Sequence, residues 1–391
     1  MPGRLILRAD AGPQIGTGHV MRCLALARAW QARRGRVELA SCRLPDALAL
    51  LAERQGVVVH RLDARPGSTA DARQTERLLR SGPVLAAWLV LDGYHFHAGY
   101  QRAIGDTSVR TLLIDDYGSL DGYETDLVLN QNLGAEASWY GARPEARTLL
   151  GPRFALLRPE FARVRRAARL VRRRAERLLI TLGGADPLNT AEELLPLMRC
   201  PSLPPTTVVR VIAGSANRHF PSLRRAVRAA ATESPCRIEL LRSTPNMSRQ
   251  MAWADLAIAA AGSTVWELSC VGTPFFSIVL ADNQRRIAAQ LDTMFPGISW
   301  GEAGRLDRDR MADDLARWSA DQVSRRERIL ALQRLVDGHG ADRVVRAMID
   351  DRAAERPGRD ARRPVDAQGK CRAGRPATAH VRSSMSSVAM S

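Results

Sequence analysis

The residues best suited to chemistry lie in a glycine-rich loop near the N-terminus. Gly16, Gly18 and His19 follow an apolar strand-like segment at 4–10 and open an amphipathic segment that predicts a helix to about Arg34. Glycines let the backbone approach a ligand closely, and a helix N-terminus attracts an anion. The spacing GxxxGxG is not the GxGxxG of dinucleotide sites. Histidine, with an ordinary pKa of about 6.5, suits a general base here, although an isolated histidine is more often structural.

A second loop of this kind follows the apolar segment 255–262. Gly262, Ser263 and Thr264 open another predicted helix, which offers a second position for an anion. Glu267 stands three residues after Thr264, so it fits a capping box. It equally fits a carboxylate that accepts hydrogen bonds from a ribose diol, and the spacing leaves both interpretations open.

Other polar residues cluster where predicted strands end. They include 92–95 with Tyr94, the pair Asp115 and Asp116, and the segment 281–284 with Asn283 and Gln284. Asx-type turns produce the same residue types, so these positions alone do not define a site. Adjacent residues of a strand point to opposite faces, so Asp115 and Asp116 are poor candidates for the two carboxylates of a glycosidase. A Gly-Gly turn at 183–184 is most simply a tight turn.

Short apolar segments alternate with helical patterns along most of the chain, which predicts parallel, doubly wound α/β sheets. The pattern occurs twice, before and after an arginine-rich stretch at 158–177. We therefore expect two Rossmann-like domains that face each other across a cleft, where loops after the strands bind ligands. The expected boundaries are 1–158 and 178–351, followed by a disordered basic tail at 352–391.

Composition limits the class of protein. The chain has 391 residues, of which 45% are hydrophobic and 25% charged, as in ordinary globular proteins. No apolar segment approaches the roughly 20 residues that span a bilayer, and no signal peptide is evident. The six cysteines form no CxxC motif and no zinc spacing, so we interpret them as reduced cysteines of a cytoplasmic protein.

The net charge of +17 does not by itself indicate nucleic-acid binding. Residues 352–391 hold nine Lys or Arg against three Asp or Glu, and residues 158–177 hold nine Arg against two Glu. Lys370 is the single lysine, so we attribute the arginine excess to gene base composition. Binding to nucleic acid requires a positioned patch rather than a net total, and we expect no such partner.

Several motifs together resemble a known family. The segments IGTGHVMRCLALA, LVLDGYHF, LLIDDYG, LLGPRFALLRPEF, LITLGGADP, MAWADLAIAAAGSTVWEL and ADNQ are similar, in this order, to the UDP-2,4-diacetamido-2,4,6-trideoxy-β-L-altropyranose hydrolases of pseudaminic acid biosynthesis. The resemblance covers about residues 4 to 290. The GST-x-x-E element is also found in the glycosyltransferases that add N-acetylglucosamine to the lipid-linked muropeptide, so it does not separate the two families.

The resemblance implies a GT-B fold that binds a UDP-sugar between its domains, without a metal or cofactor. It implies a hydrolase that cleaves the anomeric C–O bond with inversion. We expect a cytoplasmic monomer with no membrane partner. His19 would activate water, Tyr94 and Asn283 would act beside the sugar, and Glu267 would hold the ribose. The remaining substrate-binding residues would be Gly16, Gly18, Arg158, Gly262, Ser263, Thr264 and Gln284.

Three alternatives remain. A GT-B glycosyltransferase with a UDP-N-acetylhexosamine donor would share the fold but would need an acceptor. A UDP-sugar 2-epimerase would more naturally carry carboxylates placed for elimination. An arginine-rich binding protein without enzymatic activity would depend on the tail at 352–391.

Overall fold

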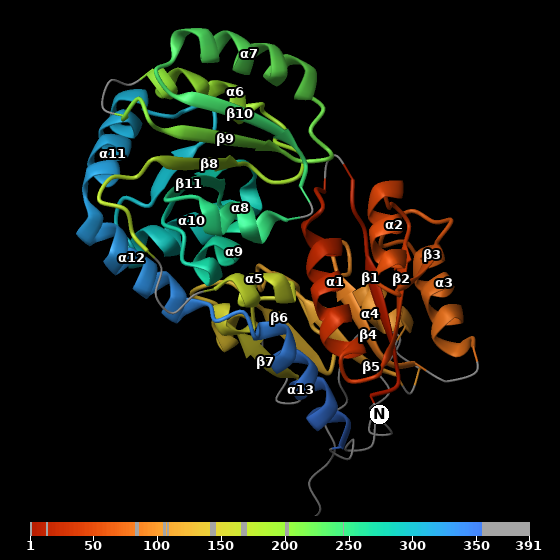
Figure 1. Cartoon of the computed structure of the whole chain (residues 1–391). Helices are drawn as coiled ribbons and strands as arrows, with labels where there is room; N and C mark the ends of the chain where they lie inside the picture. Colours follow the sequence, from red (N-terminus) through yellow and green to blue (C-terminus); the bar gives the residue numbers. More distant parts are fainter. Residues whose placement is uncertain are drawn as a thin grey trace, which may run out of the picture. The chain divides into compact units, whose positions relative to one another are not determined.

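The computed structural model describes residues 2–12, 15–82, 86–104, 107, 109–140, 146–165, 170–199, 203–244 and 246–353. Residues up to Asp350 form one compact unit, and those from Asp351 are assigned to a second. Two parallel sheets organise the first unit (Figure 1). The predicted tail at 352–391 lies almost wholly outside the described residues.

The first sheet has the strand order β3-β2-β1-β4-β5-β6-β7, with every pairing parallel. The strand order reverses between β1 and β4. In sheets of this kind, ligands bind beside the loops that follow the two strands at such a reversal. The strands are β1 (Arg4–Ala9), β2 (Arg36–Ser41), β3 (Val58–Arg61), β4 (Ala86–Asp92), β5 (Arg110–Ile114), β6 (Leu127–Asn130) and β7 (Arg147–Leu150).

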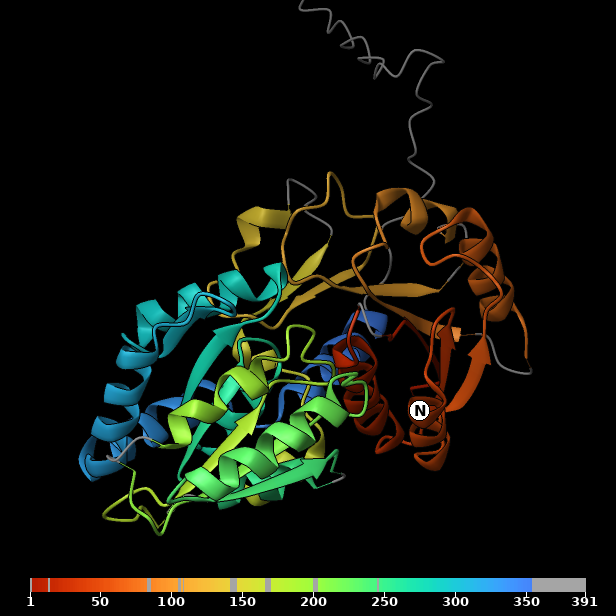
Figure 2. The same ribbon diagram turned by 90° about the horizontal axis from the view of Figure 1, so that it is seen from above.

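Apolar residues on the two faces of this sheet pack against separate layers of helices. One face packs against α1 (Gly18–Gln31), α2 (Asp46–Arg54) and α13 (Gly340–Ala353). The other packs against α3 (Thr69–Arg80), α4 (Ala98–Ile104) and η1 (Ala137–Tyr140). Figure 2 shows α1 and α13 on one side of the strands and α3 and α4 on the other. Burial on both faces explains the continuous apolar strands of the sequence.

The second sheet has the order β10-β9-β8-β11-β12-β13, again with every pairing parallel. Its order reverses between β8 and β11. The strands are β8 (Arg177–Thr181), β9 (Val208–Ala213), β10 (Arg237–Arg242), β11 (Leu256–Ala260), β12 (Phe275–Val279) and β13 (Ser299–Glu302).

Helices again cover both faces of this sheet. One layer contains α6 (Thr190–Glu193), η3 (Leu195–Arg199), α7 (Phe220–Glu233) and α11 (Arg308–Ala320). The other contains α5 (Pro159–Val164), α8 (Met247–Trp253), α9 (Thr264–Val271), α10 (Asp282–Met294) and α12 (Gln322–Leu335). Two doubly wound α/β sheets were expected from the alternating pattern, and the structure confirms them.

Helix α13 follows the second sheet in the chain but packs against the first sheet. Val344, Val345 and Met348 are buried in the same apolar cluster as Leu129 of β6 and Leu149 of β7. Figure 1 shows this helix beside β6 and β7. The expected boundaries 1–158 and 178–351 stay predictions, and the last helix packs against the first of the two sheets.

Some elements differ from the sequence expectation. The helix expected from about Asn189 ends after Glu193 and continues as a 3-10 helix, because Pro196 cannot supply the N–H that an α-helix needs. The short strands β7 and β13 were not anticipated, since four residues carry too little periodicity. Within the described part of the chain, no helix is long and apolar enough to cross a membrane.

Candidate functional site

Loops from both sheets meet around the glycine-rich segment after β1. A Cβ placed on Gly18 would lie 3.9 Å from Oγ of Ser263, in the loop after β11. A Cβ placed on Gly184, after β8, would lie only 2.8 Å from Oγ1 of Thr17. Gly184 therefore has to lack a side chain for these loops to approach as they do. The loop after β1 of the first sheet therefore lies against the loops after β8 and β11 of the second sheet.

Two helix N-termini come together at this place. Helix α1 begins at Gly18 and has no acidic residue in its first turn, whereas α9 begins at Thr264 and has Glu267 in its first turn. Each N-terminus carries about half a positive charge from the helix dipole. An anion near both ends would interact favourably with each of them. Ser263 and Thr264 could add hydroxyl donors to such an anion.

Gly16 supports the turn that leads into α1. Its φ of +79° lies in the left-handed region, and its N–H and C=O both bond to Gly12, at 2.7 and 3.1 Å. A side chain would strain this conformation. The closed turn directs the chain into α1 so that His19 is the second residue of the helix.

His19 is paired with a buried carboxylate. Its Nδ1 lies 2.6 Å from Oδ1 of Asp92, at the end of β4, and Asp92 is fully buried. Burial favours the protonated form of Asp92, but Arg22 and His19 outweigh it and hold the pKa of Asp92 well below its usual range. A carboxylate only accepts hydrogen bonds, so Nδ1 carries the proton. In neutral His19 the lone pair then belongs to Nε2, which suits it to accept a proton.

Arg22 joins two carboxylates on the same side of α1. It donates to Asp92 through Nε and Nη2, both at 2.6 Å, and to Asp116 through Nη1 at 2.9 Å. Burial opposes the cation, but Asp116 and Asp92 raise the pKa of Arg22 well above its ordinary value. Asn132 donates to Asp116 as well, at 3.0 Å. Hydrogen bonds to charged groups therefore hold Arg22, Asp92 and Asp116 in place.

Tyr94 and Asn283, expected beside the sugar, bond to each other. Nδ2 of Asn283 donates to the Tyr94 hydroxyl at 3.0 Å, and that hydroxyl donates to Oδ2 of Asp116 at 3.2 Å. The Tyr94 ring lies edge-on to the His19 ring, with 5.0 Å between centroids. Although Tyr94 as a whole is 47% exposed, desolvation of its hydroxyl and the nearby Asp116 raise its pKa, so it remains a donor. Residues of the two sheets therefore meet beside His19.

Glu267 forms an ion pair with Arg158 and does not cap a helix. Ser263, at the N-cap of α9, makes no side-chain capping bond, so the capping-box interpretation is wrong. Nη2 of Arg158 lies 3.6 Å from Oε1 of Glu267, and Nη1 lies 3.1 Å from Oε1 of Glu160. Burial raises the pKa of Glu267 to about 7, although Arg158 lowers it. The role of Glu267 as ribose acceptor stays a prediction.

Gln284, in the first turn of α10, bonds to the residue after β12 and lies near the loop after β11. Its Oε1 accepts from the N–H of Leu280 at 2.9 Å, and its Nε2 would lie 3.6 Å from a Cβ on Gly262. The amide therefore faces the Gly262–Thr264 turn. The predicted substrate-binding residues of the second sheet therefore lie in the loop before α9 and in the first turns of α9 and α10.

Sequence reasoning missed Arg22 and Asn132 and gave no role to Asp92 or Asp116. Arg22 lies three residues after His19, so both share one side of α1, and this spacing was the available signal. The carboxylates come from strands whose places beside β1 depend on strand order. Asp115 accepts from Tyr117 and Gly118 N–H groups and from the Tyr123 hydroxyl, so it stabilises a turn and takes no part in the cluster.

A second charged cluster lies around Asp10. Oδ1 of Asp10 accepts from the N–H groups of Cys42 and Arg43, and Oδ2 pairs with Arg8 at 2.8 Å and His95 at 3.2 Å. These bonds occupy both oxygens. Asp10 therefore holds the loop after β2 in place, and we assign it a structural role.

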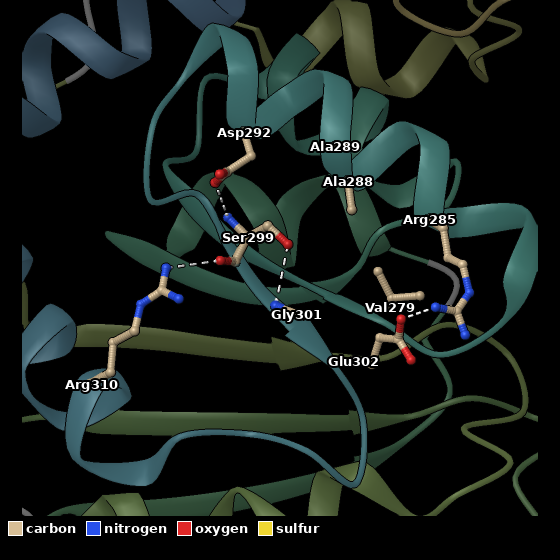
Figure 3. Close-up of a pocket in the computed structure, with 9 residues that line it drawn as sticks. All are labelled: Val279, Arg285, Ala288, Ala289, Asp292, Ser299, Gly301, Glu302 and Arg310. Atoms are coloured by element: carbon tan, nitrogen blue, oxygen red, sulfur yellow. Dashed lines mark hydrogen bonds and ion pairs between the residues drawn. The ribbon is translucent and has the colours of Figure 1, made fainter.

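A hollow of about 360 Å³ on the second sheet lies on a different face of α10 (Figure 3). It is lined by Arg285, Ala288 and Asp292, which helical spacing places opposite Asn283. Arg285 pairs with Glu302, and Asp292 accepts from the Ser299 N–H. None of the predicted site residues lines this hollow.

No group of three or more His, Cys, Asp or Glu with the arrangement of metal ligands occurs among the described residues. The expectation of a metal-free site stays a prediction.

Comparison with known proteins finds distant relatives of the chain. No family model matches the chain. It is 24% identical over 345 residues to the spore coat polysaccharide biosynthesis protein SpsG of Bacillus subtilis, covering 88% of this chain and 96% of the relative. It is 26% identical over 291 residues to the UDP-2,4-diacetamido-2,4,6-trideoxy-beta-L-altropyranose hydrolase of Campylobacter jejuni, covering 74% of this chain and 96% of the relative.

Solved structures show the fold. The crystal structure of MurG from Acinetobacter baumannii superposes with a TM-score of 0.59 at 16% identity, over 89% of this chain and 99% of that one. The chain has two doubly wound sheets and superposes on this structure over most of its length. These two observations confirm the expected GT-B fold. The chain thus has a GT-B fold and is distantly similar to a protein named UDP-2,4-diacetamido-2,4,6-trideoxy-beta-L-altropyranose hydrolase, which confirms the resemblance that the sequence motifs predicted.

Proposed function

We propose that this protein processes sugar nucleotides as a hydrolase of a UDP-linked 2,4-diacetamido-2,4,6-trideoxyhexose of the altrose type. The products are UDP and the free sugar, a precursor for nonulosonic acids such as pseudaminic acid. The name of the Campylobacter jejuni relative supports the substrate class. The observation that carries the proposal is the position of His19, paired with Asp92, next to two apposed helix N-termini.

The reaction needs one base and a stabilised leaving group. His19 Nε2 takes a proton from water while the water oxygen forms a bond to the anomeric carbon. The bond from that carbon to the diphosphate oxygen breaks, and UDP leaves with the electron pair. Attack from the face opposite UDP inverts the anomeric centre. Because diphosphate is a good leaving group, no second carboxylate acting as an acid is required.

The loops around Gly18 and Ser263 stabilise the diphosphate. The N-termini of α1 and α9 each contribute about 0.3–1 kcal/mol toward a nearby anion at an exposed end, and more when partly buried. Glu267 accepts from the ribose hydroxyls, and Arg158 keeps its carboxylate in place. Tyr94 and Asn283 lie on the sugar side of the site. This division of roles requires no metal.

Glycosyl transfer is the second candidate function, because CalG4, a calicheamicin glycosyltransferase, superposes on this chain with a TM-score of 0.59 at 16% identity. A transferase would move the sugar to an acceptor hydroxyl instead of water. It would release little UDP when no acceptor is present. Rates of UDP release with and without added acceptors therefore distinguish the two reactions.

The decisive experiment uses the UDP-sugar in ¹⁸O-labelled water with EDTA. We expect UDP release at a constant rate and the label in the free sugar. Label in UDP would mean cleavage of a P–O bond and would exclude this mechanism. His19→Ala should lower kcat by about 10²–10⁴-fold with little change in the Kd for UDP. The matched control is His97→Ala, which changes a histidine outside the cluster.

A further inference from the structure

We infer that Arg22 is a positioning residue that fixes the orientation of His19 and connects it, through Asp116 and Tyr94, to Asn283 of the second sheet. The inference deepens the proposed function and rests on it only for the kinetic part of the test.

The first step is the contact between Arg22, Asp92 and His19. Nη2 of Arg22 lies 2.6 Å from Oδ1 of Asp92, the same oxygen that binds Nδ1 of His19. Nη2 also lies 3.2 Å from Nδ1 itself. Arg22 and His19 therefore hold one carboxylate oxygen between them. The side chain of Asp92 cannot rotate without breaking bonds to both.

The second step is the geometry that only a guanidinium provides. Nε and Nη2 bind the two oxygens of Asp92, and Nη1 binds both oxygens of Asp116, at 2.9 and 3.0 Å. The planar fork of arginine presents five donors in fixed directions, whereas lysine is a single point charge. Lysine at this position would keep the charge and could not bind both carboxylates with the same geometry.

The third step leads to the other sheet. Asp116 accepts from the Tyr94 hydroxyl, and the same hydroxyl accepts from Asn283 at the start of α10. Nη1 of Arg286, one turn further along α10, donates to the carbonyl of Tyr117 at 2.9 Å. The chain of bonds from Asn283 to His19 is therefore continuous. A change in the contact of α10 with the first sheet reaches the imidazole through four side chains.

The test compares variants at Arg22 with a control on the same helix. Arg22→Lys retains the charge, Arg22→Met removes it, and Arg28→Met changes an exposed arginine of α1. We expect Arg22→Lys to lower kcat by about 10²-fold while KM and the Kd for UDP change by less than about threefold. Arg28→Met should behave like the unchanged protein. A kcat for Arg22→Lys within about twofold of the unchanged protein would overturn the inference.

A spectroscopic readout is independent of activity. In protein labelled with ¹⁵N-histidine, the proton on Nδ1 of His19 gives a hydrogen-bonded signal, assigned by its loss in His19→Ala. We expect this signal to shift or broaden in Arg22→Lys and also in Tyr94→Phe, which keeps the ring and removes the linking hydroxyl. A signal unchanged in both variants would refute the connection to the second sheet. If no UDP-sugar is hydrolysed, the proposed function fails, and this signal still decides the role of Arg22.

Chemical rescue covers the case in which the charge-removing variant is less stable. Methylguanidine added to Arg22→Ala should restore part of kcat and the Nδ1 signal, since it can bridge the carboxylates. Ethylammonium, a matched cation without the fork, should not. Equal rescue by the two cations would mean that charge alone suffices, which contradicts a positioning role. If Arg22→Ala does not bind UDP, the test of the positioning role rests on Tyr94→Phe. This variant lacks only a hydroxyl.

Discussion

At the scale of single residues, the site is defined by what each group is able to donate or accept. Asp92 is a buried acceptor, Arg22 a permanent donor, and Tyr94 both. These constraints leave one tautomer for neutral His19, with its proton on Nδ1. Once the side chains are close together, the chemistry of each group decides which one donates the hydrogen bond and which one accepts it.

Asp92→Asn tests this tautomer. An asparagine amide can turn its NH₂ toward His19 Nδ1, which moves the imidazole proton to Nε2 and removes the base. We expect kcat to fall by about 10²–10⁴-fold while UDP still binds. Turnover in steady state and UDP calorimetry measure the two effects. Asp121→Asn, at an exposed position, is the control. Unchanged turnover in Asp92→Asn would contradict the assigned tautomer.

Glu267 predicts a pH dependence of UDP binding. Burial raises its pKa to about 7 in the free protein, and accepting bonds from two hydroxyls favours its ionised form. Binding below pH 7 therefore has to release a proton, so the affinity should rise about tenfold per pH unit up to about pH 7 and then level off. UDP itself also titrates in this pH range. The pH profile of UDP binding to Glu267→Gln therefore reports the contribution of UDP alone. Identical pH profiles for the two proteins would exclude Glu267 from the ribose site.

At the scale of elements, the site depends on where helices begin. Helices α1 and α9 start at loops that follow β1 and β11, the strands next to the reversals in strand order. Parallel strands direct all such loops to one edge of their sheet. A glycine is needed at position 184, because a Cβ there would lie 2.8 Å from Oγ1 of Thr17 in the loop after β1.

Gly18→Ala tests the anion position at the start of α1. A Cβ would be in ordinary contact with Ser263, so we expect the melting temperature to stay within about 2 °C. The methyl group would occupy space that the diphosphate needs, so the Kd for UDP should rise about tenfold or more. Gly122→Ala also adds a Cβ at 3.9 Å from its nearest neighbour, away from the site, and is the matched control. Unaltered UDP affinity in Gly18→Ala would place the diphosphate elsewhere.

At the scale of the whole molecule, the candidate site draws on two sheets. His19 and its carboxylate partners come from the first, whereas Ser263, Glu267 and Asn283 come from the second. Helix α13 then packs on the first sheet after the chain has completed the second. Each half alone would carry an incomplete set of groups.

The C-terminal residues predict a simple outcome at this scale. Removing residues after Ala353 deletes the basic tail and leaves the described elements intact. We expect kcat and KM to stay within about twofold of the full chain, because no site residue lies there. Binding to DNA, measured as a function of salt, is the companion assay. Loss of turnover, or loss of a strong salt-dependent affinity for DNA, would favour the alternative of a nucleic-acid-binding protein.

The sequence by itself determined much of this protein. Apolar periodicity predicted the alternation of strands and helices, since burial on both faces of a parallel sheet requires it. Glycines beside polar residues at strand ends predicted the loops around His19 and Ser263. These features are local, so they are visible in a single chain segment.

Only the tertiary structure decided which side chains meet. Asp92 and Asp116 reach Arg22 across 70 and 94 residues of chain, and Asn283 reaches Tyr94 across 189. Such pairings depend on strand order and on the contact between the sheets, which no local pattern contains. The same holds for Glu267: spacing allowed a helix cap, and the approach of Arg158 assigned the carboxylate a different partner.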